Sequence, residues 1–401
     1  MTDQQLLSLV EQHGTPLFVY DTDAMVARAE AVYAAFLGEV EVHYATKANA
    51  APEVLRALQP HVAGADVTSV GALRGALEAG FVGAAVQYTS PGKSPEDLEA
   101  ALKQCATVVL GCVDEAADLV AAATRLGLAS ADIPTLVRVN PLERIHAFRS
   151  PTGGVPSPFG IPEEELDEAL PRLSALGLVP RGLHVHRGSQ CTSATAFSRH
   201  VDATLTLAER LHVEHGLPLH INLGGGLGVA PSGSKELPLE SLGRRCARSL
   251  RAFRAAHPSA TFAIEPGRYL VAEFGTLALR VLRRRTARGT TFLVLDAGID
   301  AFLFASERMR HGPPPPMRVL HSDATETTAS TAGSEATRVT IVGPACTGED
   351  TLVRDAELSA SPGDVLLVEH AGAYAAGASV RGFLGRDPVR EVPLTGAISR
   401  S

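Results

Sequence analysis

Short apolar segments recur along the first two thirds of the chain, each with the length of a buried β-strand. Helix-period segments lie between them, such as Pro95 to Gln104 after the candidate cap Ser94, and Glu115 to Leu126 after Asp114. The eight apolar segments are residues 40–47, 65–69, 84–90, 107–113, 135–140, 182–189, 219–226 and 261–268. Parallel strands need helical crossovers and eight can close on themselves, so the pattern predicts an α/β fold with a TIM-like (β/α)8 barrel.

After about residue 274 the pattern changes to short strands without long helices between them, which predicts a second, mostly β domain. Examples of these strands are residues 276–281, 291–295, 338–342, 364–368 and 389–392. A strand at residues 16–20 precedes the barrel, and we expect it to pair into the second domain. We therefore assign residues 30–274 to the barrel, and residues 1–29 and 275–401 to the β domain. The Ser/Thr/Ala-rich residues 322–334 are typical of a mobile surface loop.

Composition and charge exclude several classes of protein. The 401 residues are 45% hydrophobic with a net charge of −8 and have no concentrated run of lysine and arginine, so we expect neither nucleic acid nor membrane as a partner. The start of the chain is unlike a signal peptide and no apolar run approaches the length of a membrane span, so a cytoplasmic location is expected. The five cysteines show neither zinc-site spacing nor a disulfide framework.

The ends of the predicted strands carry the candidate chemistry. Lys47 ends the first strand, His186 and Ser189 the sixth, a glycine run the seventh, and Glu265 with Arg268 the eighth. Active sites of such barrels lie at the C-terminal ends of the strands, so these groups are expected at one mouth. An amine, an imidazole, bare backbone N–H groups and a carboxylate are what a pyridoxal phosphate site needs.

Each residue also has a plainer interpretation. Lys47 alone fits a solvated cation at a strand end, and Glu265 fits a structural pair with Arg268. His184 and His186 have the spacing of a metal-binding His-x-His pair, but no matching later histidine and aspartate stand at strand ends, so we expect no metal. The run Gly224, Gly225 and Gly226 lacks the nucleotide-binding fingerprint and fits a tight turn as well as a phosphate cradle.

The chain resembles the fold-type III pyridoxal phosphate decarboxylases, the group of diaminopimelate and ornithine decarboxylases, over nearly its whole length. The motifs that carry the resemblance are Tyr44-Ala45-Thr46-Lys47-Ala48-Asn49, Asp66-Val67-Thr68-Ser69, Phe159-Gly160-Ile161, His184-Val185-His186-Arg187-Gly188-Ser189-Gln190, Gly224-Gly225-Gly226, Glu265-Pro266-Gly267-Arg268, Gly343-Pro344-Ala345-Cys346 and Gly372-Ala373-Tyr374. The resemblance implies an alanine-racemase-like fold and an amino-acid decarboxylase that uses pyridoxal 5′-phosphate.

The resemblance also implies roles for single residues. Lys47 would bind the cofactor covalently, His186 would stack on its ring and Glu265 would meet the ring nitrogen. The residues implied to hold the phosphate or a substrate carboxylate are Ser189, Gly224, Gly225, Gly226, Arg268 and Tyr374. Cys346 would reach the neighbouring subunit's site as a proton donor, which implies a homodimer with shared active sites. Taken alone, Cys346 fits a buried inert thiol.

Departures from the family's pattern concern the substrate. Diaminopimelate and ornithine decarboxylases have an acidic residue after this cysteine, whereas here Thr347 follows and Glu349 comes two residues later. A neutral threonine lacks the charge that a distal ammonium favours. Residues 148–160 are similar to decarboxylases of siderophore and carrier-protein pathways. We therefore expect an α-decarboxylase of an amino acid, or of an amino-acid conjugate linked to a larger acid or carrier, in a specialised pathway, with Arg268, Thr347 and Glu349 near the substrate.

Four alternatives remain open. The chain could be a diaminopimelate decarboxylase in which Glu349 takes over the distal amine. An amino-acid racemase of the same fold would place an arginine where Glu265 stands. A non-catalytic pyridoxal phosphate carrier would not need the second domain or Cys346, and a metal-dependent barrel hydrolase would need a further metal ligand.

Overall fold

The computed structural model describes residues 1–401 except 232–233, 311, 322–336 and 395–401. The chain divides into two compact units, a barrel unit of Met25–Ala230 and Ser234–Leu270, and a β unit that contains Met1–Ala24 and Val271–Ser401. Residues 25–29 thus group with the barrel and residues 271–274 with the β unit, so both boundaries lie slightly earlier in the chain than expected. The loop predicted at residues 322–334 lies outside the described residues.

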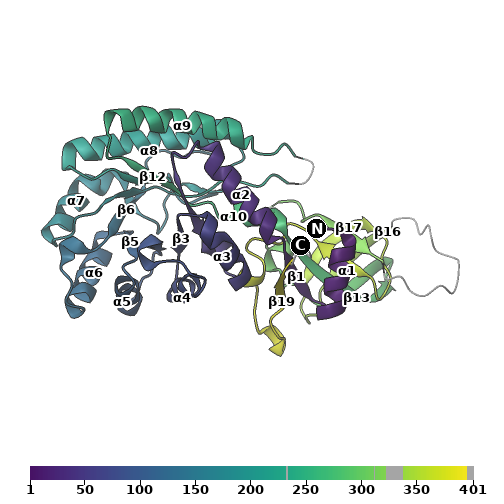
Figure 1. Ribbon diagram of the computed structural model, residues 1–401. Coiled ribbons are helices and arrows are strands. Elements are labelled where there is room, and N and C mark those ends of the chain that lie inside the picture. Colours follow the sequence, from purple (N-terminus) through teal and green to yellow (C-terminus); the bar gives the residue numbers. More distant parts are fainter. Residues whose placement is uncertain (232–233, 311, 322–336, 395–401) are drawn as a thin grey trace, which may run out of the picture. The chain divides into compact units, whose positions relative to one another are not determined.

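Eight parallel strands form a closed barrel (Figure 1). Neighbours follow the order β5-β4-β3-β2-β12-β11-β9-β6, and pairing of β5 with β6 closes the ring. The strands are β2 (Glu41–Ala45), β3 (Gly64–Val67), β4 (Val86–Thr89), β5 (Thr107–Leu110), β6 (Thr135–Asn140), β9 (Gly182–His184), β11 (His220–Asn222) and β12 (Thr261–Ile264). Each overlaps one of the eight apolar segments, so the predicted (β/α)8 barrel is confirmed.

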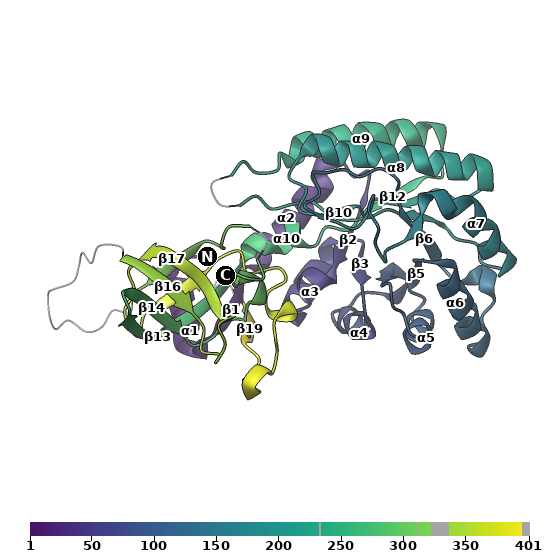
Figure 2. The ribbon, with the colours of Figure 1, turned by 180° about the vertical axis from the view of Figure 1, so that it is seen from behind.

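Helices lie outside the ring of strands, as Figure 1 and Figure 2 show from opposite sides. They are α2 (Thr22–Ala35), α3 (Pro52–Leu58), α4 (Val70–Glu78), α5 (Pro95–Lys103), α6 (Val113–Arg125), α7 (Leu166–Ala175), α8 (Ala194–His215) and α9 (Leu239–Ala256). The short helix α10 (Arg268–Val271) follows β12. The crossovers that parallel strands require are therefore in place.

Helix caps follow the sequence signals with one exception. Ser94 caps α5 in a capping box with Asp97, and the side chain of Asp21 accepts a hydrogen bond from the N–H of Ala24 at the start of α2. Asp114, predicted to precede a helix that starts at Glu115, lies instead in the first turn of α6, because that helix begins two residues earlier, at Val113. A carboxylate there still favours the helix through its dipole.

The β unit contains a curled sheet with the order β15-β18-β13-β14-β16-β17. The strands are β13 (Gly275–Ala287), β14 (Thr290–Leu295), β15 (Met317–Leu320), β16 (Thr337–Val342), β17 (Thr351–Leu358) and β18 (Val365–Val368). The N-terminal strand β1 (Leu17–Tyr20) pairs antiparallel with β13 and parallel with β19 (Arg390–Pro393). The expected pairing of this strand into the second domain is confirmed.

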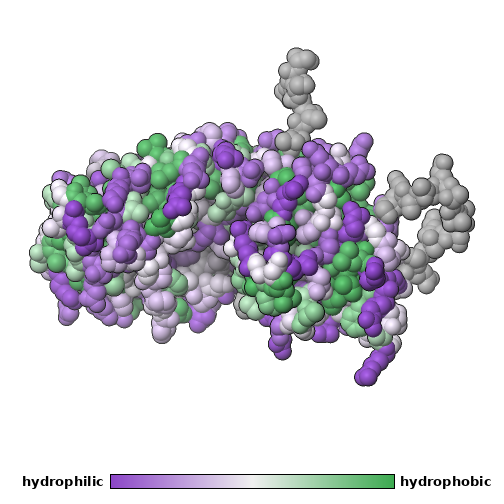
Figure 3. Space-filling view, turned by 90° about the horizontal axis from the view of Figure 1, so that it is seen from below, coloured by the Kyte–Doolittle hydropathy of each residue, from purple (hydrophilic) through white to green (hydrophobic). Residues whose placement is uncertain are grey.

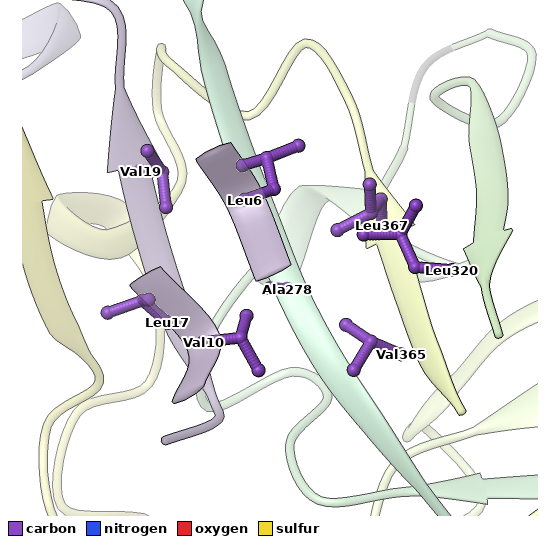
Figure 4. Close-up of a cluster of buried hydrophobic side chains, with 8 residues drawn as sticks. All are labelled: Leu6, Val10, Leu17, Val19, Ala278, Leu320, Val365 and Leu367. Atoms are coloured by element: carbon purple, nitrogen blue, oxygen red, sulfur yellow. The ribbon is translucent and has the colours of Figure 1, made fainter. Parts of the chain in front are cut away.

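A buried apolar cluster joins the N-terminal helix α1 (Asp3–His13) to this sheet (Figure 4). Its members come from α1, β1, β13, β15 and β18, and are Leu6, Val10, Leu17, Val19, Ala278, Leu320, Val365 and Leu367. Burial of such side chains stabilises a fold by about 1.5–3 kcal/mol each. The first twenty residues are thus held in the β unit by their own core contacts.

Two strands of the β unit, β15 and β17, are not among the predicted examples. The second half of β17 carries Arg354, Asp355 and Glu357, and Asp355 has a positive φ of 54°, so the apolar alternation breaks within the strand. β15 is short and follows a proline-rich segment. A single-sequence pattern therefore reports neither strand.

The described surface is mixed in character. On the face drawn in Figure 3, hydrophilic residues are interspersed with small hydrophobic patches. Among the described residues, every helix falls short of the length and hydrophobicity that crossing a membrane requires.

Candidate active site at the barrel mouth

Lys47 lies in a single 3-10 turn (Thr46–Ala48) directly after β2. Its side chain is 36% exposed, and its Nζ atom is 3.3 Å from Oδ2 of the buried Asp66 on β3. Burial, followed by repulsion from Glu265, raises the pKa of Asp66, while the charge of Lys47 opposes that change. The amine is therefore held at the mouth by a carboxylate and remains accessible from outside.

Glu265 follows β12 and is almost completely buried. His184 Nε2 donates to its Oε2 at 3.0 Å, and Asn222 Nδ2 donates to its Oε1 at 2.6 Å. Burial would raise the pKa of Glu265, but His184 and Lys47 together lower it below its ordinary value. Glu265 is thus a buried anion bonded to His184 and Asn222, where one alternative from the sequence was a structural pair with Arg268.

His186 lies just beyond the end of β9, which stops at His184. Its Nδ1 accepts a hydrogen bond from the N–H of Gly225 at 3.0 Å, which places the ring against the glycine turn. Burial, with the charges of Lys47 and Arg138, lowers the pKa of His186 well below its usual value. The imidazole is therefore neutral and carries its proton on Nε2. Since His184 faces Glu265 and His186 faces Gly225, the two rings have separate partners.

The glycine run forms a tight turn that larger residues would disrupt. A Cβ atom on Gly225 would lie 2.3 Å from the Glu265 carbonyl oxygen, and one on Gly226 would lie 2.6 Å from the Gly188 carbonyl oxygen. Gly224 and Gly226 also have positive φ angles of 65° and 109°. Among the described residues no acceptor is found for the N–H of Gly226. The turn thus serves close packing and leaves a backbone donor for an anion.

A buried pair supports this turn from behind. Arg187 donates from Nε to His200 Nδ1 at 3.0 Å, and His200 Nε2 lies 2.7 Å from the carbonyl oxygen of Leu223, just before the glycines. Because Nδ1 accepts from Arg187, the ring proton lies on Nε2 and is donated to Leu223. Burial and the charge of Arg187 lower the pKa of His200 to about 3. Sequence reasoning assigned no role to either residue.

The remaining barrel candidates also lie at strand ends. Ser189 is partly exposed on β10 (Gly188–Ser189), which pairs with β7 (Ser150–Pro151). Arg268 begins α10, one turn after Glu265. The structure thus gathers Lys47, His186, Gly225 and Glu265 through direct contacts or shared neighbours, as the strand-end argument predicts.

Four candidates belong to the β unit. Cys346 is exposed, so its interpretation as a buried thiol is wrong, and Thr347 is half-buried beside it. Glu349 is exposed and forms an ion pair with Arg308. Tyr374 has a positive φ of 53°, an uncommon backbone state for a residue with a side chain.

The loop that carries Cys346 is anchored by Asp350, which is almost fully buried. Its Oδ1 accepts from the N–H of Ile299 at 2.8 Å, and its Oδ2 accepts from the N–H of Ala345 at 2.7 Å. Gly298 and Gly343 pack so closely on this carboxylate that a Cβ atom on either would fall within 2.4 Å of it. The position of Cys346 within its own unit is therefore well defined.

The donor set of the barrel mouth fits pyridoxal phosphate. An accessible amine on Lys47 suits a covalent bond to an aldehyde, and the buried anion Glu265 suits a protonated pyridine nitrogen. The unused N–H of Gly226 suits a phosphate oxygen. His184 Nδ1, a buried polar atom at the site, has no hydrogen-bond partner among the described residues. Buried polar atoms usually have partners, so this nitrogen favours a bound polar group.

Comparisons with known proteins agree with this chemistry. Residues 23–272 match the family described as pyridoxal-dependent decarboxylase, pyridoxal binding domain. L-glutamyl-[BtrI acyl-carrier protein] decarboxylase of Niallia circulans is 28% identical over 403 residues, covering 97% of this chain and 90% of that protein. Diaminopimelate decarboxylase of Deinococcus radiodurans is 32% identical over 395 residues, covering 98% and 93%.

The similarity extends to solved structures. The crystal structure of diaminopimelate decarboxylase from Helicobacter pylori complexed with L-lysine matches with a TM-score of 0.83 and 27% identity, covering 97% of this chain and 93% of that chain. The chain belongs to the pyridoxal-dependent decarboxylases. It is a carboxy-lyase with pyridoxal phosphate as its cofactor, in the alanine-racemase-like fold that the resemblance implied.

Proposed function

We propose that this enzyme removes the α-carboxyl group of an amino acid that is acidic or is part of a larger conjugate, in a specialised pathway. The observation that carries the proposal is the state of the residues after Cys346. Thr347 is neutral, and the Glu349 carboxylate is paired with Arg308. A substrate with a distal ammonium would therefore meet neither a carboxylate at position 347 nor an unpaired one at position 349.

The relative from Niallia circulans supports this choice of substrate class. Its name describes a glutamyl group carried on an acyl-carrier protein, which is an amino acid held in a conjugate. The diaminopimelate decarboxylases support a second candidate, since they match over as much of the chain. In that case the Arg308–Glu349 pair would have to open to receive the distal amine.

The roles of the site residues are those that the family resemblance implies. Lys47 would hold the cofactor, His186 would lie against its ring, Glu265 would favour the protonated ring nitrogen, and Ser189, Arg268, Tyr374 and the 224–226 turn would bind phosphate or substrate carboxylate. When bound, pyridoxal phosphate supplies an electron-withdrawing ring that accepts the electron pair left as carbon dioxide departs. Glu265 is suited to this role because His184 and Asn222 keep it anionic and fixed in orientation.

Cys346 and Lys47 are the two residues that would carry protons during the reaction. Lys47 lies against Asp66, which would stabilise its ammonium whenever the amine is not engaged. Cys346, exposed on an anchored loop, would return a proton to the α-carbon of the product. In this proposal the enzyme is a homodimer, and Cys346 of one subunit serves the site of the other.

A substrate panel tests the proposal. The holoenzyme is incubated with L-glutamate, diaminopimelate, ornithine and a glutamyl thioester of a pantetheine analogue, and carbon dioxide release is measured. We expect the glutamyl thioester or free glutamate to have the highest kcat/KM. Preferential turnover of diaminopimelate, with lysine as product, would select the second candidate, and the Lys47→Ala variant is the control for uncatalysed release.

A further inference from the structure

A continuous row of polar side chains crosses the inside of the barrel from its N-terminal floor to Glu265. The row consists of His43 on β2, Gln87 on β4, Asn222 on β11 and Glu265 after β12. Their exposed fractions are 6%, 3%, 0% and 4%. Branched apolar residues usually fill such barrels, so a buried polar row is a departure that needs a reason.

Hydrogen bonds connect every member of the row. Gln87 Nε2 lies 3.2 Å from His43 Nδ1, and Gln87 Oε1 lies 2.7 Å from Asn222 Nδ2. Asn222 Nδ2 also donates to Glu265 Oε1 at 2.6 Å, and Asn222 Oδ1 accepts from the N–H of Gly224 at 2.8 Å. Each of the two carboxamides thus uses both its oxygen and its nitrogen in the row.

Only one assignment of donors and acceptors satisfies every hydrogen bond in this row. The N–H of Gly224 can only donate, so Asn222 must turn Oδ1 to it and Nδ2 to Gln87 and Glu265. Gln87 must then accept with Oε1, which leaves its Nε2 facing His43. Nδ1 of His43 must therefore be the acceptor, and the ring proton lies on Nε2. A backbone N–H in the glycine turn fixes the tautomer of an imidazole at the other end of the barrel.

The far end of the row is a cavity that can exchange protons with water. His43 Nε2 donates to Oε2 of Glu41 at 3.3 Å, and Glu41 is exposed. The cavity has a volume of about 320 Å³ and is lined by residues at the N-terminal ends of the strands. The charged and titratable groups that face His43 there are Glu41, Arg181 and His220.

A second proton on His43 cannot be accommodated without cost. Protonated Nδ1 would face Gln87 Nε2, two donors in contact. Rotating the Gln87 amide would place its Nε2 against Asn222 Nδ2, and rotating Asn222 would set its Oδ1 against Glu265 and abandon Gly224. At least one buried hydrogen bond is lost in every arrangement, and buried polar networks lose stability when they are partly satisfied.

We propose that Gln87 and His43 are positioning residues for Glu265. They hold Asn222 in the orientation that donates to the carboxylate, and protonation of His43 at the floor of the barrel disturbs that donation at the opposite mouth. The inference rests on the proposed role of Glu265 toward the cofactor. It adds a route by which solution pH acts on the site without titrating any residue that touches the cofactor.

The tautomer of His43 gives a test independent of the cofactor. Holoenzyme labelled with ¹⁵N-histidine is examined by two-bond ¹H–¹⁵N correlation, with the His43 signals assigned by their loss in His43→Phe. We expect the Nε2–H tautomer at alkaline pH. An Nδ1–H tautomer would overturn the proposal, whereas a wrong role for Glu265 would leave this measurement unchanged, so the two failures are distinguishable.

The second readout is the pH dependence of the bound cofactor's long-wavelength absorption. We expect Gln87→Leu and His43→Phe to shift its midpoint by about one pH unit, a tenfold change in the protonation equilibrium. His220→Gln is the matched control, because His220 lines the same cavity but bonds to Thr261 instead of Gln87, and its midpoint should be that of the parent. Equal midpoints in all four proteins, or an equal shift in His220→Gln, would contradict the proposal.

Gln87→Glu keeps the test valid if Gln87→Leu does not fold. Its carboxylate still accepts from Asn222 and places a negative charge against His43 Nδ1. A carboxylate can only accept, so the same NMR correlation should show a proton on His43 Nδ1. An Nδ1 atom that stays without a proton would show that residue 87 does not contact His43.

Discussion

His184 donates a hydrogen bond from Nε2 to Oε2 of Glu265 at 3.0 Å, and both side chains are almost completely buried. The pair stands at the C-terminal mouth of the barrel, where Asn222 supplies the second donor to the same carboxylate. A buried carboxylate is costly unless donors surround it. The anionic state of Glu265 is therefore a property of the protein that exists before any cofactor binds.

Removing that donor should destabilise the fold. We expect His184→Phe to lower the free energy of unfolding by about 3 kcal/mol at pH 7, because it leaves a buried charge without one partner. Urea unfolding monitored by circular dichroism measures this. His184→Gln, which keeps an N–H donor, should recover most of the loss, and equal stability of the parent and His184→Phe would contradict the assignment.

The pair of His184 and Glu265 also makes the stability of the fold depend on pH. The folded state lowers the pKa of Glu265, so the pairing contributes stability that is fully present above the unfolded pKa of about 4.3 and is lost as pH falls toward the folded value. The stability difference between the parent and His184→Phe should therefore be largest near neutral pH and shrink below about pH 4.

His200 should contribute to acid sensitivity with a different window. Its pKa falls to about 3 in the folded protein, against about 6.5 when unfolded, so the unfolded chain binds an extra proton between these values and stability declines as pH falls through them. We expect His200→Asn to remove up to about 1.4 kcal/mol per pH unit from that slope. His146→Asn, a change at an exposed histidine, is the control; the same slope in the parent and His200→Asn would contradict the account.

The sequence alone located the barrel, its eight strands and the ends that carry Lys47, His186 and Glu265. Strand periodicity and strand ends are local properties of the chain, and the C-terminal ends of parallel strands must meet. The partners of Glu265 could not be found in this way. His184 and Asn222 are 81 and 43 residues away in the chain, and Gln87 is 135 residues from Asn222. Only the closed ring of strands brings them together.

The exposure of single side chains was also beyond the sequence. Cys346 resembled a small core residue by type, but Asp350 anchors its loop at the surface. The ion pair between Arg308 and Glu349 joins residues 41 positions apart, and no local sequence pattern predicts it. In contrast, the helix cap at Ser94 could be predicted, because the two residues of its capping box, Ser94 and Asp97, are three positions apart.

Mixing two inactive variants tests the proposal that two subunits share each active site. Lys47→Ala and Cys346→Ala should each have little activity alone, while subunit exchange between them restores roughly a quarter of the parent activity, since half of the dimers are mixed and each has one intact site. Cys346→Ala should retain the cofactor absorption. Cys105→Ala, at another exposed cysteine, is the control, and no recovery on mixing would show that Lys47 and Cys346 of one chain form the site.

An acid after Cys346 should change the substrate preference. We expect Thr347→Glu to raise kcat/KM for diaminopimelate by about tenfold or more, because a charge-assisted hydrogen bond is worth about 1.5–3 kcal/mol. Thr347→Gln, of similar size and neutral, should not. Steady-state kinetics with diaminopimelate and with the glutamyl thioester measure the effect. Equal gains in the two variants would show that the size of the side chain at position 347, and not its charge, sets the preference.

The proposed function depends above all on covalent binding of the cofactor by Lys47. Reduction of the holoenzyme with borohydride, followed by peptide mass spectrometry, identifies the lysine that carries it. We expect a phosphopyridoxyl group on Lys47 and none on Lys93, Lys103 or Lys235. Lys93 is an internal control, since its Nζ is buried and bonded to Glu115 and to the carbonyl oxygens of Ser90 and Val109. An unmodified Lys47 with the label on another lysine would show that Lys47 does not bind the cofactor.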